Sequence, residues 1–298
     1  MMLDRAAGAL RDCPAPAKLN LFLHVTGRRA DGYHLLQTVF QLLDHGDTLH
    51  FQLRDDTLIR RSSELAGVPE QDDLVVRAAL ALQAQALRRT GRLPAGVDIA
   101  LDKRLPMGGG LGGGSSDAAT TLMALNCLWD VGLTRPELMA LGLPLGADIP
   151  FFLFGQTAFA EGVGEALQPV AAPDCWYVVI EPGVAVPTAA IFCAEDLTRD
   201  SKPVKIADFS SHHANGTVAA GFGRNDLQQV ATRLYRPVAE AVTWLGRYGD
   251  ARMTGSGACV FCAFSCEEQA DAVLSELPAV WTAWKAKALA HHPLAALL

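Results

Sequence analysis

The stretch Pro106–Asp117 reads PMGGGLGGGSSD, with six glycines in the seven positions from Gly108 to Gly114. Glycine loses more conformational entropy on folding than any other residue, so such a run needs a structural or functional reason. The preceding segment, VDIALDKRL at 97–105, alternates apolar and polar residues as a strand does. The following segment, Ser115–Trp129, has a helical composition. The glycine run therefore links a predicted strand to the start of a predicted helix.

A glycine-rich helix start of this kind predicts an anion-binding site. Ser115 or Ser116 is expected to be the N-cap, and Asp117 suits the positive end of the helix dipole. The first backbone N–H groups of a helix have no partner inside the helix, so they can bind an anion. Glycines let the anion approach the backbone with no side chain in the way. The sequence thus predicts a phosphate-binding loop.

Three other interpretations of the glycine run fit less well. A P-loop requires a lysine before the serine, and no lysine precedes Ser115 or Ser116. The dinucleotide fingerprint G-x-G-x-x-G matches from Gly108 to Gly113, but Pro106-Met107 intervenes after the strand. Its acidic partner would be Asp130, at the end of an apparent helix rather than of a strand. A purely structural turn does not explain the flanking proline, the serine pair and the strong helix. Because the dinucleotide fingerprint fits poorly, a nicotinamide oxidoreductase is a remote alternative.

The whole chain has the composition of a globular protein. Of its 298 residues, 50% are hydrophobic and 19% are charged. The net charge of −7, without blocks of like charge, argues against binding to nucleic acid or to an anionic membrane. A locally positive nucleotide site remains compatible with it. No signal peptide or membrane span is expected, and the seven cysteines are expected to be reduced thiols, which together favour the cytoplasm.

The candidate metal ligands of the chain are interpreted as structural residues. Cys259 and Cys262 form a C-x-x-C, but positions three apart on a predicted strand point to opposite faces. We therefore expect both to be small buried apolar residues. The pairs His212–His213 and His291–His292 lack a cysteine or carboxylate partner at ligand spacing. They are expected to be solvated loop and tail residues.

Predicted strands and helices alternate in both halves of the chain. In residues 17–25 one face of the strand should carry Leu19, Leu21, Leu23 and Val25, and the other Lys18, Asn20, Phe22 and His24. Further strands are expected at 35–43, 48–53, 97–101, 176–181 and 258–264, and helices at 72–90, 115–129, from 134, from 187, 225–235, 236–248 and 267–277. Residues 208–225 are expected to be a long loop, and the tail 281–298 a helix without a functional interpretation. This alternation predicts an α/β or α+β protein with two closely packed lobes and a soft boundary near residue 165.

The motifs of the chain resemble those of the GHMP kinases. PMGGGLGGGSSDAA is similar to the phosphate loop of that superfamily, and MTGSGACVF to its third glycine motif. PAKLNLFLHVTGRRADGYHLLQTVFQ, LGADIPFFLFGQTAFAEGVGE, PGVAVPTAAIF and RNDLQ resemble a narrower family within it, in order from about residue 14 to residue 264. The resemblance implies the two-lobed GHMP kinase fold. Its ribosomal-protein-S5-like ATP lobe would span residues 1–165, and its ferredoxin-like C-terminal lobe residues 166–298.

The resemblance also implies an activity and a catalytic pair. The narrower family transfers phosphate from ATP, with Mg²⁺, to the 2-hydroxyl of a cytidine diphosphate-linked methylerythritol in non-mevalonate isoprenoid synthesis. Lys18 and Asp148 match its catalytic pair. Asp148 would accept the proton of the attacking hydroxyl or orient that hydroxyl, and Lys18 would stabilise negative charge on the transferring phosphoryl group. The expected state is a monomer or a weak homodimer.

Further site residues follow by position from the same resemblance. The ATP-binding set comprises Lys103, Pro106, Gly108, Gly109, Gly110, Leu111, Gly112, Gly113, Gly114, Ser115 and Ser116, with Asp73 near the nucleotide. The substrate-binding set comprises Asn20, Tyr33, His34, Thr188 and Phe192, whose aromatic members would enclose the cytosine. The third glycine motif comprises Gly255, Ser256 and Gly257.

Two questions stay open at the level of the sequence. Asp117 departs from the superfamily, which commonly has a small or neutral residue there; an acid beside triphosphate would repel it unless it points away or helps to hold Mg²⁺. The metal ligands are therefore left unassigned. Another GHMP kinase, acting on homoserine or mevalonate, is an alternative that Tyr33-His34 and the Thr188/Phe192 pair disfavour. A nucleotide-binding module without catalysis is a second alternative, disfavoured by the intact Lys18 and Asp148.

Overall fold

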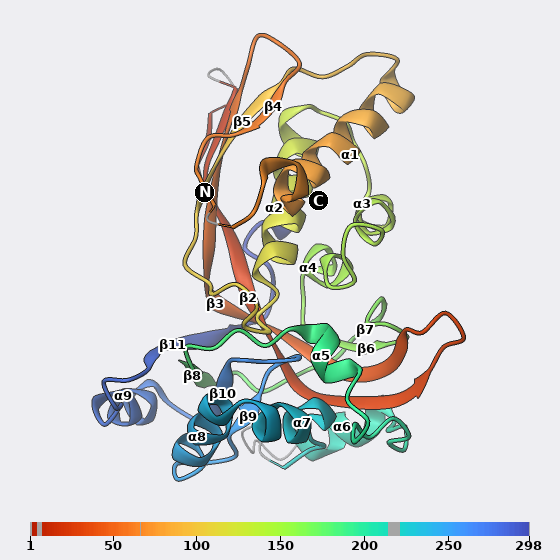
Figure 1. Ribbon diagram of the computed structural model, residues 1–298. Coiled ribbons are helices and arrows are strands. Elements are labelled where there is room, and N and C mark those ends of the chain that lie inside the picture. The colour runs from red at the N-terminus through yellow and green to blue at the C-terminus, as the bar shows by residue number, and fades with distance from the viewer. Residues whose placement is uncertain (1, 5–7, 66, 214–220, 298) are drawn as a thin grey trace.

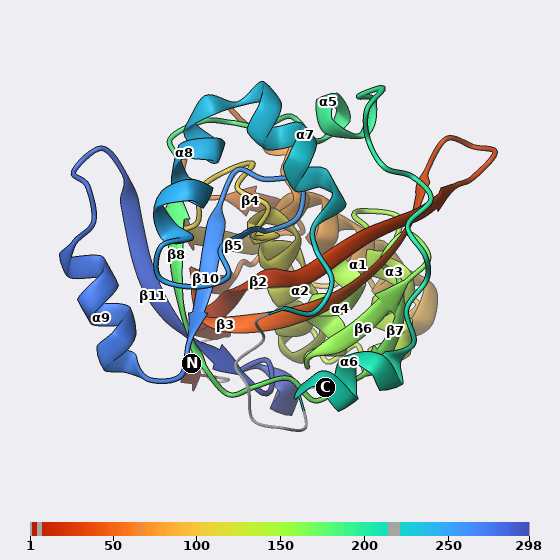
Figure 2. The same ribbon diagram turned by 90° about the horizontal axis from the view of Figure 1, so that it is seen from below.

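The computed structural model describes residues 2–4, 8–65, 67–213 and 221–297 (Figure 1). Its longest element is an antiparallel hairpin of two 20-residue strands, β2 (Ala9–Arg28) and β3 (His34–Leu53). The turn between them contains Asp31-Gly32, and Gly32 has the positive φ of 94° that favours glycine. The hairpin crosses the molecule, and its tip projects beyond the neighbouring helices (Figures 1 and 2).

Bulges divide β2 between different parts of the core, so the predicted single apolar face is wrong. The register against β3 shifts between Asn20 and Leu23, which exchanges the faces of the strand. Leu19, Leu21 and Phe22 therefore pack in one apolar cluster, and Leu23 and Val25 pack in another. The polar residues on the other face are buried as well.

Four helices cover one face of the first half of the sheet (Figure 1). The sheet here contains β2, β3, β4 (Ile59–Arg61) and β5 (Val97–Asp102), and β5 buries alternate residues as predicted. The helices are α1 (Leu74–Thr90), α2 (Gly113–Leu128), α3 (Arg135–Gly142) and α4 (Ile149–Phe154). The side chain of Asp73 caps α1 by accepting a hydrogen bond from Val75 N.

The second half of the chain forms the other end of the same sheet. Its strands lie in the order β11 (Thr282–Leu289), β8 (Trp176–Glu181), β10 (Val260–Phe264) and β9 (Arg252–Met253), and β11 also pairs with β3. The helices are α5 (Thr188–Phe192), α6 (Ile206–His213), α7 (Asp226–Leu234), α8 (Arg236–Leu245) and α9 (Glu267–Ser275). The short elements are β1 (Met2–Asp4), β6 (Ala158–Glu161), β7 (Ala166–Pro169), η1 (Glu70–Asp72) and η2 (Ala295–Leu297). The predicted mixed α/β class is confirmed.

The C-terminal tail corrects two predictions. The segment expected to be helical is largely the strand β11, which pairs with β8 and β3. In this strand Ala286 and Ala288 are buried, while the intervening Lys287 remains partly exposed. His292, expected to be solvated, is 2% exposed. Its backbone N–H donates to Gly155 O at 2.8 Å, and burial lowers the pKa of its imidazole to about 3. Tertiary packing, rather than local preference, decides the structure of this tail.

Part of the predicted loop 208–225 is also different. Its first residues belong to α6, whereas 214–220 lie outside the described residues. The interpretation of the C-x-x-C is confirmed, since Cys259 and Cys262 pack in different apolar clusters. Among the helices of the described residues, none has both the length and the apolarity to span a membrane.

A buried carboxylate fastens β2 to the second half of the chain. Asp226, at the start of α7, is 4% exposed. It accepts hydrogen bonds from Val25 N at 2.8 Å, from Ser201 Oγ at 2.6 Å and from Arg224 Nε at 2.6 Å. Because a buried carboxylate needs its hydrogen bonds, these contacts hold the C-terminal part of β2 against α7.

We expect Asp226→Ala to lower the free energy of unfolding by about 3 kcal/mol, because it leaves the buried Val25 N–H without an acceptor. The matched control is Asp196→Ala, which removes a 2.7 Å ion pair to Arg233. The Asp196 side chain is 44% exposed. That change should cost less than about 1 kcal/mol. Urea unfolding measures both, and equal losses in the two variants would contradict the role of Asp226.

Candidate active site

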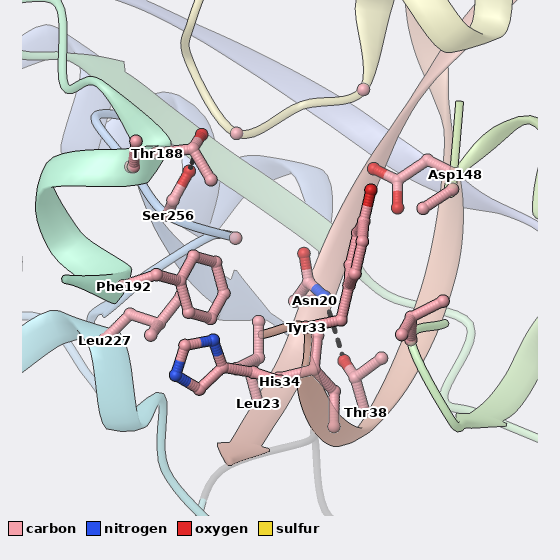
Figure 3. Close-up of a pocket in the computed structure, with 18 of the residues that line it drawn as sticks. Asn20, Leu23, Tyr33, His34, Thr38, Asp148, Thr188, Phe192, Leu227 and Ser256 are labelled. Carbon is pink, nitrogen blue, oxygen red and sulfur yellow. Dashed lines mark hydrogen bonds between the residues drawn. The ribbon is translucent and has the colours of Figure 1, made fainter. Parts of the chain in front are cut away.

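Two cavities meet at the glycine loop, defined here as residues 108–114. The larger has a volume of about 700 Å³ and opens between β2, β3, α5 and the loop (Figure 3). The smaller has a volume of about 370 Å³ and lies on the side of the loop that carries Leu74, Lys103 and Asp117. Gly108, Gly110 and Gly112 line both cavities, so the loop forms the wall between them.

Nearly all the site residues expected from the sequence line one cavity or the other. The larger cavity is lined by Lys18, Asn20, Tyr33, His34, Gly108, Gly110, Gly112, Asp148, Thr188, Phe192, Gly255, Ser256 and Gly257, among others. The smaller is lined by Asp73, Lys103, Pro106, Gly109, Leu111, Gly113, Gly114 and Ser115 as well. Ser116 is the exception, because its side chain is buried and its hydroxyl donates to Pro16 O at 2.7 Å.

Lys18 is a buried ammonium group at the inner end of the larger cavity. It is 3% exposed, donates to Asn20 Oδ1 at 2.6 Å and lies 3.5 Å from Asp148 Oδ2. Its ammonium also lies 5.2 Å from the centroid of the Phe40 ring, within reach of a cation–π interaction. Burying a charge is costly unless it is paired, so these neighbours keep Lys18 in place beside the cavity.

A chain of polar side chains positions Asn20 beside Lys18. Asn20 Nδ2 donates to Thr38 Oγ1 at 2.9 Å, and the Thr38 hydroxyl donates in turn to Phe22 O. Asn20 N donates to Thr254 Oγ1 at 3.0 Å. Sequence reasoning missed Thr38 and Thr254. The signal for Thr254 was its place immediately before the third glycine motif, whereas Thr38 reads as an ordinary strand residue.

Asp148 lies directly before α4, where the N-terminus of that helix favours a negative charge. Its side chain makes no capping hydrogen bond to the helix and is 32% exposed. The carboxylate is therefore open to the larger cavity and close to Lys18. An ammonium and an open carboxylate at this separation can act together on a hydroxyl group and on a developing negative charge.

Close backbone packing explains the glycines of the loop. Gly110 has a φ of +77°, and a Cβ added to it would lie 2.1 Å from Thr254 O. Gly112, with a φ of +73°, would place a Cβ 2.8 Å from the Phe152 ring. These two positions require glycine for conformation and for space. The loop is thus held between the third glycine motif on one side and α4 on the other.

The predicted N-cap of the helix after the loop is wrong. Gly112 is the N-cap, and α2 begins at Gly113, so Ser115 and Ser116 lie inside the first turn. The hydroxyl of Ser116 is committed to the backbone of β2, which leaves it no capping role. The strand–glycine loop–helix arrangement itself is confirmed, and the helix start adjoins both cavities.

Asp117 lies beneath the smaller cavity in a cluster with Lys103 and Asp47. Lys103 Nζ lies 2.8 Å from Asp117 Oδ2 and 2.5 Å from Asp47 Oδ2. Burial, together with the neighbouring Asp47 carboxylate, raises the pKa of Asp117 to about 8 despite the lysine. Asp117 Oδ1 is buried without a hydrogen-bond partner among the described residues. This acid is therefore packed against a lysine inside the protein, which resolves how it is tolerated at the helix start.

The outer end of the larger cavity is aromatic. The His34 and Phe192 rings stack with centroids 4.8 Å apart and an interplanar angle of 29°, while Tyr33, at 65% exposure, stands across from them (Figure 3). Thr188 Oγ1 and Ser256 Oγ form a hydrogen bond of 2.8 Å at the side of the cavity. The hairpin tip and α5, which are far apart in the sequence, together form a platform for a planar ligand.

We expect Gly110→Ala to destabilise the fold more than Gly108→Ala. Both glycines have a positive φ, +77° and +70°, so both changes impose similar backbone strain. Only the Gly110 Cβ meets a backbone atom, because nothing lies within 4 Å of a Cβ at Gly108. Gly110→Ala should therefore cost at least about 1 kcal/mol more. Thermal unfolding of both variants measures this, and an equal loss of stability would refute the close approach to Thr254.

Asp117→Asn should change how stability depends on pH. The raised pKa means that folded Asp117 keeps a proton which the unfolded chain releases, so the wild type loses stability as pH rises toward 8. Asparagine carries no such proton, and the stability of the variant relative to wild type should increase from about pH 5 to about pH 8. Urea unfolding at a series of pH values measures this, with the exposed Asp55→Asn as control. A constant difference across that range would contradict the assigned protonation.

Comparison with known proteins places these features in a family. The N-terminal domain model of the GHMP kinases matches residues 73–156, and the C-terminal model matches residues 206–283. The chain is 67% identical over 288 residues to 4-diphosphocytidyl-2-C-methyl-D-erythritol kinase of Janthinobacterium sp. (strain Marseille), covering 97% of this chain and 98% of that one. It is 68% identical over 288 residues to the protein of the same name from Herminiimonas arsenicoxydans, with the same coverage.

Solved structures agree with this placement. A crystal structure of 4-(cytidine 5'-diphospho)-2C-methyl-D-erythritol kinase superposes with a TM-score of 0.79 at 34% identity, covering 92% of this chain and 98% of that chain. A homoserine kinase from Cytophaga hutchinsonii, at 15% identity and a TM-score of 0.67 with 98% of each chain covered, shares the fold. The chain therefore belongs to the 4-diphosphocytidyl-2-C-methyl-D-erythritol kinase family of the GHMP kinases.

Proposed function

We propose that this protein transfers the γ-phosphoryl group of ATP to the 2-hydroxyl of 4-diphosphocytidyl-2-C-methyl-D-erythritol, giving the 2-phosphate and ADP for non-mevalonate isoprenoid synthesis. The observation that carries the proposal is the position of the Lys18–Asp148 pair. The pair shares one cavity with the glycine loop and with an aromatic platform at the opposite end. A phosphate donor and a base-bearing alcohol can therefore meet at the pair.

The residues of the loop fit the phosphates of ATP. The cradle is built from glycines whose Cβ atoms would strike Thr254 O or the Phe152 ring, and it leads into the N-terminus of α2. Backbone N–H groups and the positive end of the helix dipole would hold the phosphate oxygens. Lys18, at the border of the cradle, would neutralise charge that develops on the transferred group.

Asp148 is proposed to act on the acceptor hydroxyl. Its carboxylate is open to the cavity, so it can accept a hydrogen bond from the 2-hydroxyl and take up its proton during transfer. Lys18 lies 3.5 Å away, so its positive charge stands beside both the carboxylate and the hydroxyl that it would bind. Phosphoryl transfer depends chiefly on alignment and charge neutralisation, and both groups are held on rigid elements.

Mg²⁺ would enter with the nucleotide and neutralise its phosphate charge. In such sites Mg²⁺ is held largely by phosphates and water, with one or two carboxylates. Asp148 is proposed above to act on the acceptor hydroxyl, and Asp117 is buried against Lys103. We therefore propose that the phosphates of ATP and water would hold Mg²⁺, and that Asp117 is a structural residue.

The aromatic end is proposed to bind the cytosine. Tyr33 and Phe192 present flat faces on two sides of the cavity, and His34 lies beside Phe192 with its ring edge available (Figure 3). Stacking contributes about 1–3 kcal/mol per base. Asn20 and Thr188 would contact the remainder of the substrate from β2 and α5.

We further propose that the protein acts in the cytoplasm on small molecules alone, as a monomer or a weak homodimer, without binding nucleic acid or membranes. We also propose that the chain divides into an N-terminal ATP-binding domain, residues 1–165, and a C-terminal domain, residues 166–298. In support, the two matched family models, at 73–156 and 206–283, lie on either side of that boundary.

The assay that tests the function follows ADP release with ATP, Mg²⁺ and the diphosphocytidyl alcohol, with homoserine, mevalonate and galactose in parallel. We expect turnover with the cytidyl substrate, and Asp148→Asn should lower kcat by about 10²–10⁴-fold while nucleotide binding is kept. The control is Asp196→Asn, an exposed carboxylate on the surface, which should retain full activity. Background ADP release with the cytidyl substrate would refute the function, and full turnover by Asp148→Asn would remove that residue from the mechanism.

A further inference from the structure

A single arginine outside the sequence-predicted site touches two residues of the aromatic platform. Arg199 Nε donates to His34 Nε2 at 3.2 Å. Its Nη2 group donates to Phe192 O at 3.0 Å and to Ala194 O at 2.7 Å, and its Nη1 group donates to Leu197 O at 3.1 Å. The guanidinium is thus anchored by backbone carbonyls at and after the end of α5, and it presents its Nε–H to the imidazole.

This contact determines which nitrogen of His34 carries the proton. A guanidinium has five N–H donors and no acceptor, so the ring nitrogen that faces it must accept. His34 Nε2 is therefore unprotonated, and the hydrogen of the neutral ring lies on Nδ1. Burial, and then the positive charges of Arg199 and Arg28, lower the pKa of His34, which agrees with a neutral ring at physiological pH.

The other ring nitrogen is directed to the cavity. In Figure 3, Nδ1 lies on the side of the His34 ring nearer to Tyr33 and Asn20, and Nε2 points the other way. Within the described part of the chain, no hydrogen bond to a protein group occupies Nδ1. The stacking on Phe192, whose carbonyl Arg199 also holds, fixes the plane of the ring. One arginine therefore sets the proton position, and helps to set the orientation, of the group at the platform.

We propose that Arg199 is a positioning residue that makes His34 a hydrogen-bond donor at Nδ1 toward the bound base. This inference rests on the proposed function, because it concerns how the same cavity selects its base. The ring nitrogen N3 of cytosine is an acceptor, whereas N3 of uracil carries a hydrogen. A fixed donor at this edge satisfies cytosine and opposes uracil, and a mismatched buried donor is costly. Arg199 thus favours the cytidine over the uridine form of the substrate.

The first test reads the tautomer directly and requires no turnover. In ¹⁵N-histidine-labelled wild type, with signals assigned by the His34→Gln spectrum, Nδ1 of His34 should have a protonated, pyrrole-type shift and Nε2 an unprotonated, pyridine-type shift. In Arg199→Met the ring should lose this fixed state and titrate nearer to its ordinary pKa of about 6.5. The control Arg28→Met removes a charge near His34 that is not hydrogen-bonded to the ring, and should keep the tautomer. A pyridine-type Nδ1 in the wild type overturns the proposal.

The second test compares cytidine with uridine. The ratio of kcat/KM for the cytidine and uridine forms of the substrate should fall at least 10-fold in Arg199→Met, chiefly through KM for the cytidine form. Arg199→Lys cannot hold the carbonyls at the end of α5 in the same fork, but it retains a hydrogen-bond donor for His34. Because of that donor, it should restore most of the ratio. If Arg199 only stiffened α5, Arg199→Met would raise KM for both substrates equally, and that result overturns the proposal.

The two tests separate this inference from the proposed function. A wild type that phosphorylates neither substrate refutes the function, and the discrimination is then measured by titration with cytidine and uridine diphosphates. The same fall in the cytidine-to-uridine affinity ratio is expected in Arg199→Met. If that variant does not fold, the wild-type tautomer and Arg199→Lys still decide. A pyridine-type Nδ1 of His34 in the wild type would contradict the assignment. So would an Arg199→Lys variant that loses the preference for cytidine while His34 keeps its tautomer.

Discussion

An ammonium group buried to 3% exposure cannot be left without partners, and the partners of Lys18 organise the site. Its side chain meets Asn20 from the same strand, Asp148 from the start of α4 and the face of Phe40 from β3. Its backbone N–H donates to Leu111 O at 3.0 Å, so the same residue also fixes the glycine loop. A bulged strand, a helix start and a glycine loop are thereby brought to one point.

The two ends of the larger cavity then have different physical characters. At the inner end, charges and backbone N–H groups are prearranged, which is the environment that phosphoryl transfer requires. At the outer end, rings from the hairpin tip and α5 provide a flat apolar surface with one oriented hydrogen-bond donor. Arg199 belongs to this second end, although it lines neither of the two cavities at the glycine loop.

Much of the fold was predictable because its elements agree with their own local patterns. The alternation in β5, the Asp73 cap of α1 and the helices α7, α8 and α9 follow the sequence closely. The failures occur where tertiary contacts outweigh local preference. The alanine-rich tail becomes β11 because β8 and β3 offer it backbone partners, and the face of β2 switches at a bulge that no periodicity reveals. Ser116 donates to β2 rather than capping α2, since the helix already begins at Gly113 and Ser116 lies inside its first turn.

The sequence by itself determined the candidate machinery, because the glycine loop, Lys18, Asp148 and the aromatic pair stand in short motifs whose residue types carry the chemistry. It also determined the family, through several such motifs in order. Only the tertiary structure decided which groups support them. Thr38 and Thr254 hold Asn20, Lys103 pairs with Asp117, and Arg199 reaches His34 across 165 positions of the chain. Hydrogen bonds depend on direction and on a distance of about 3 Å, and sequence separation carries no information about either.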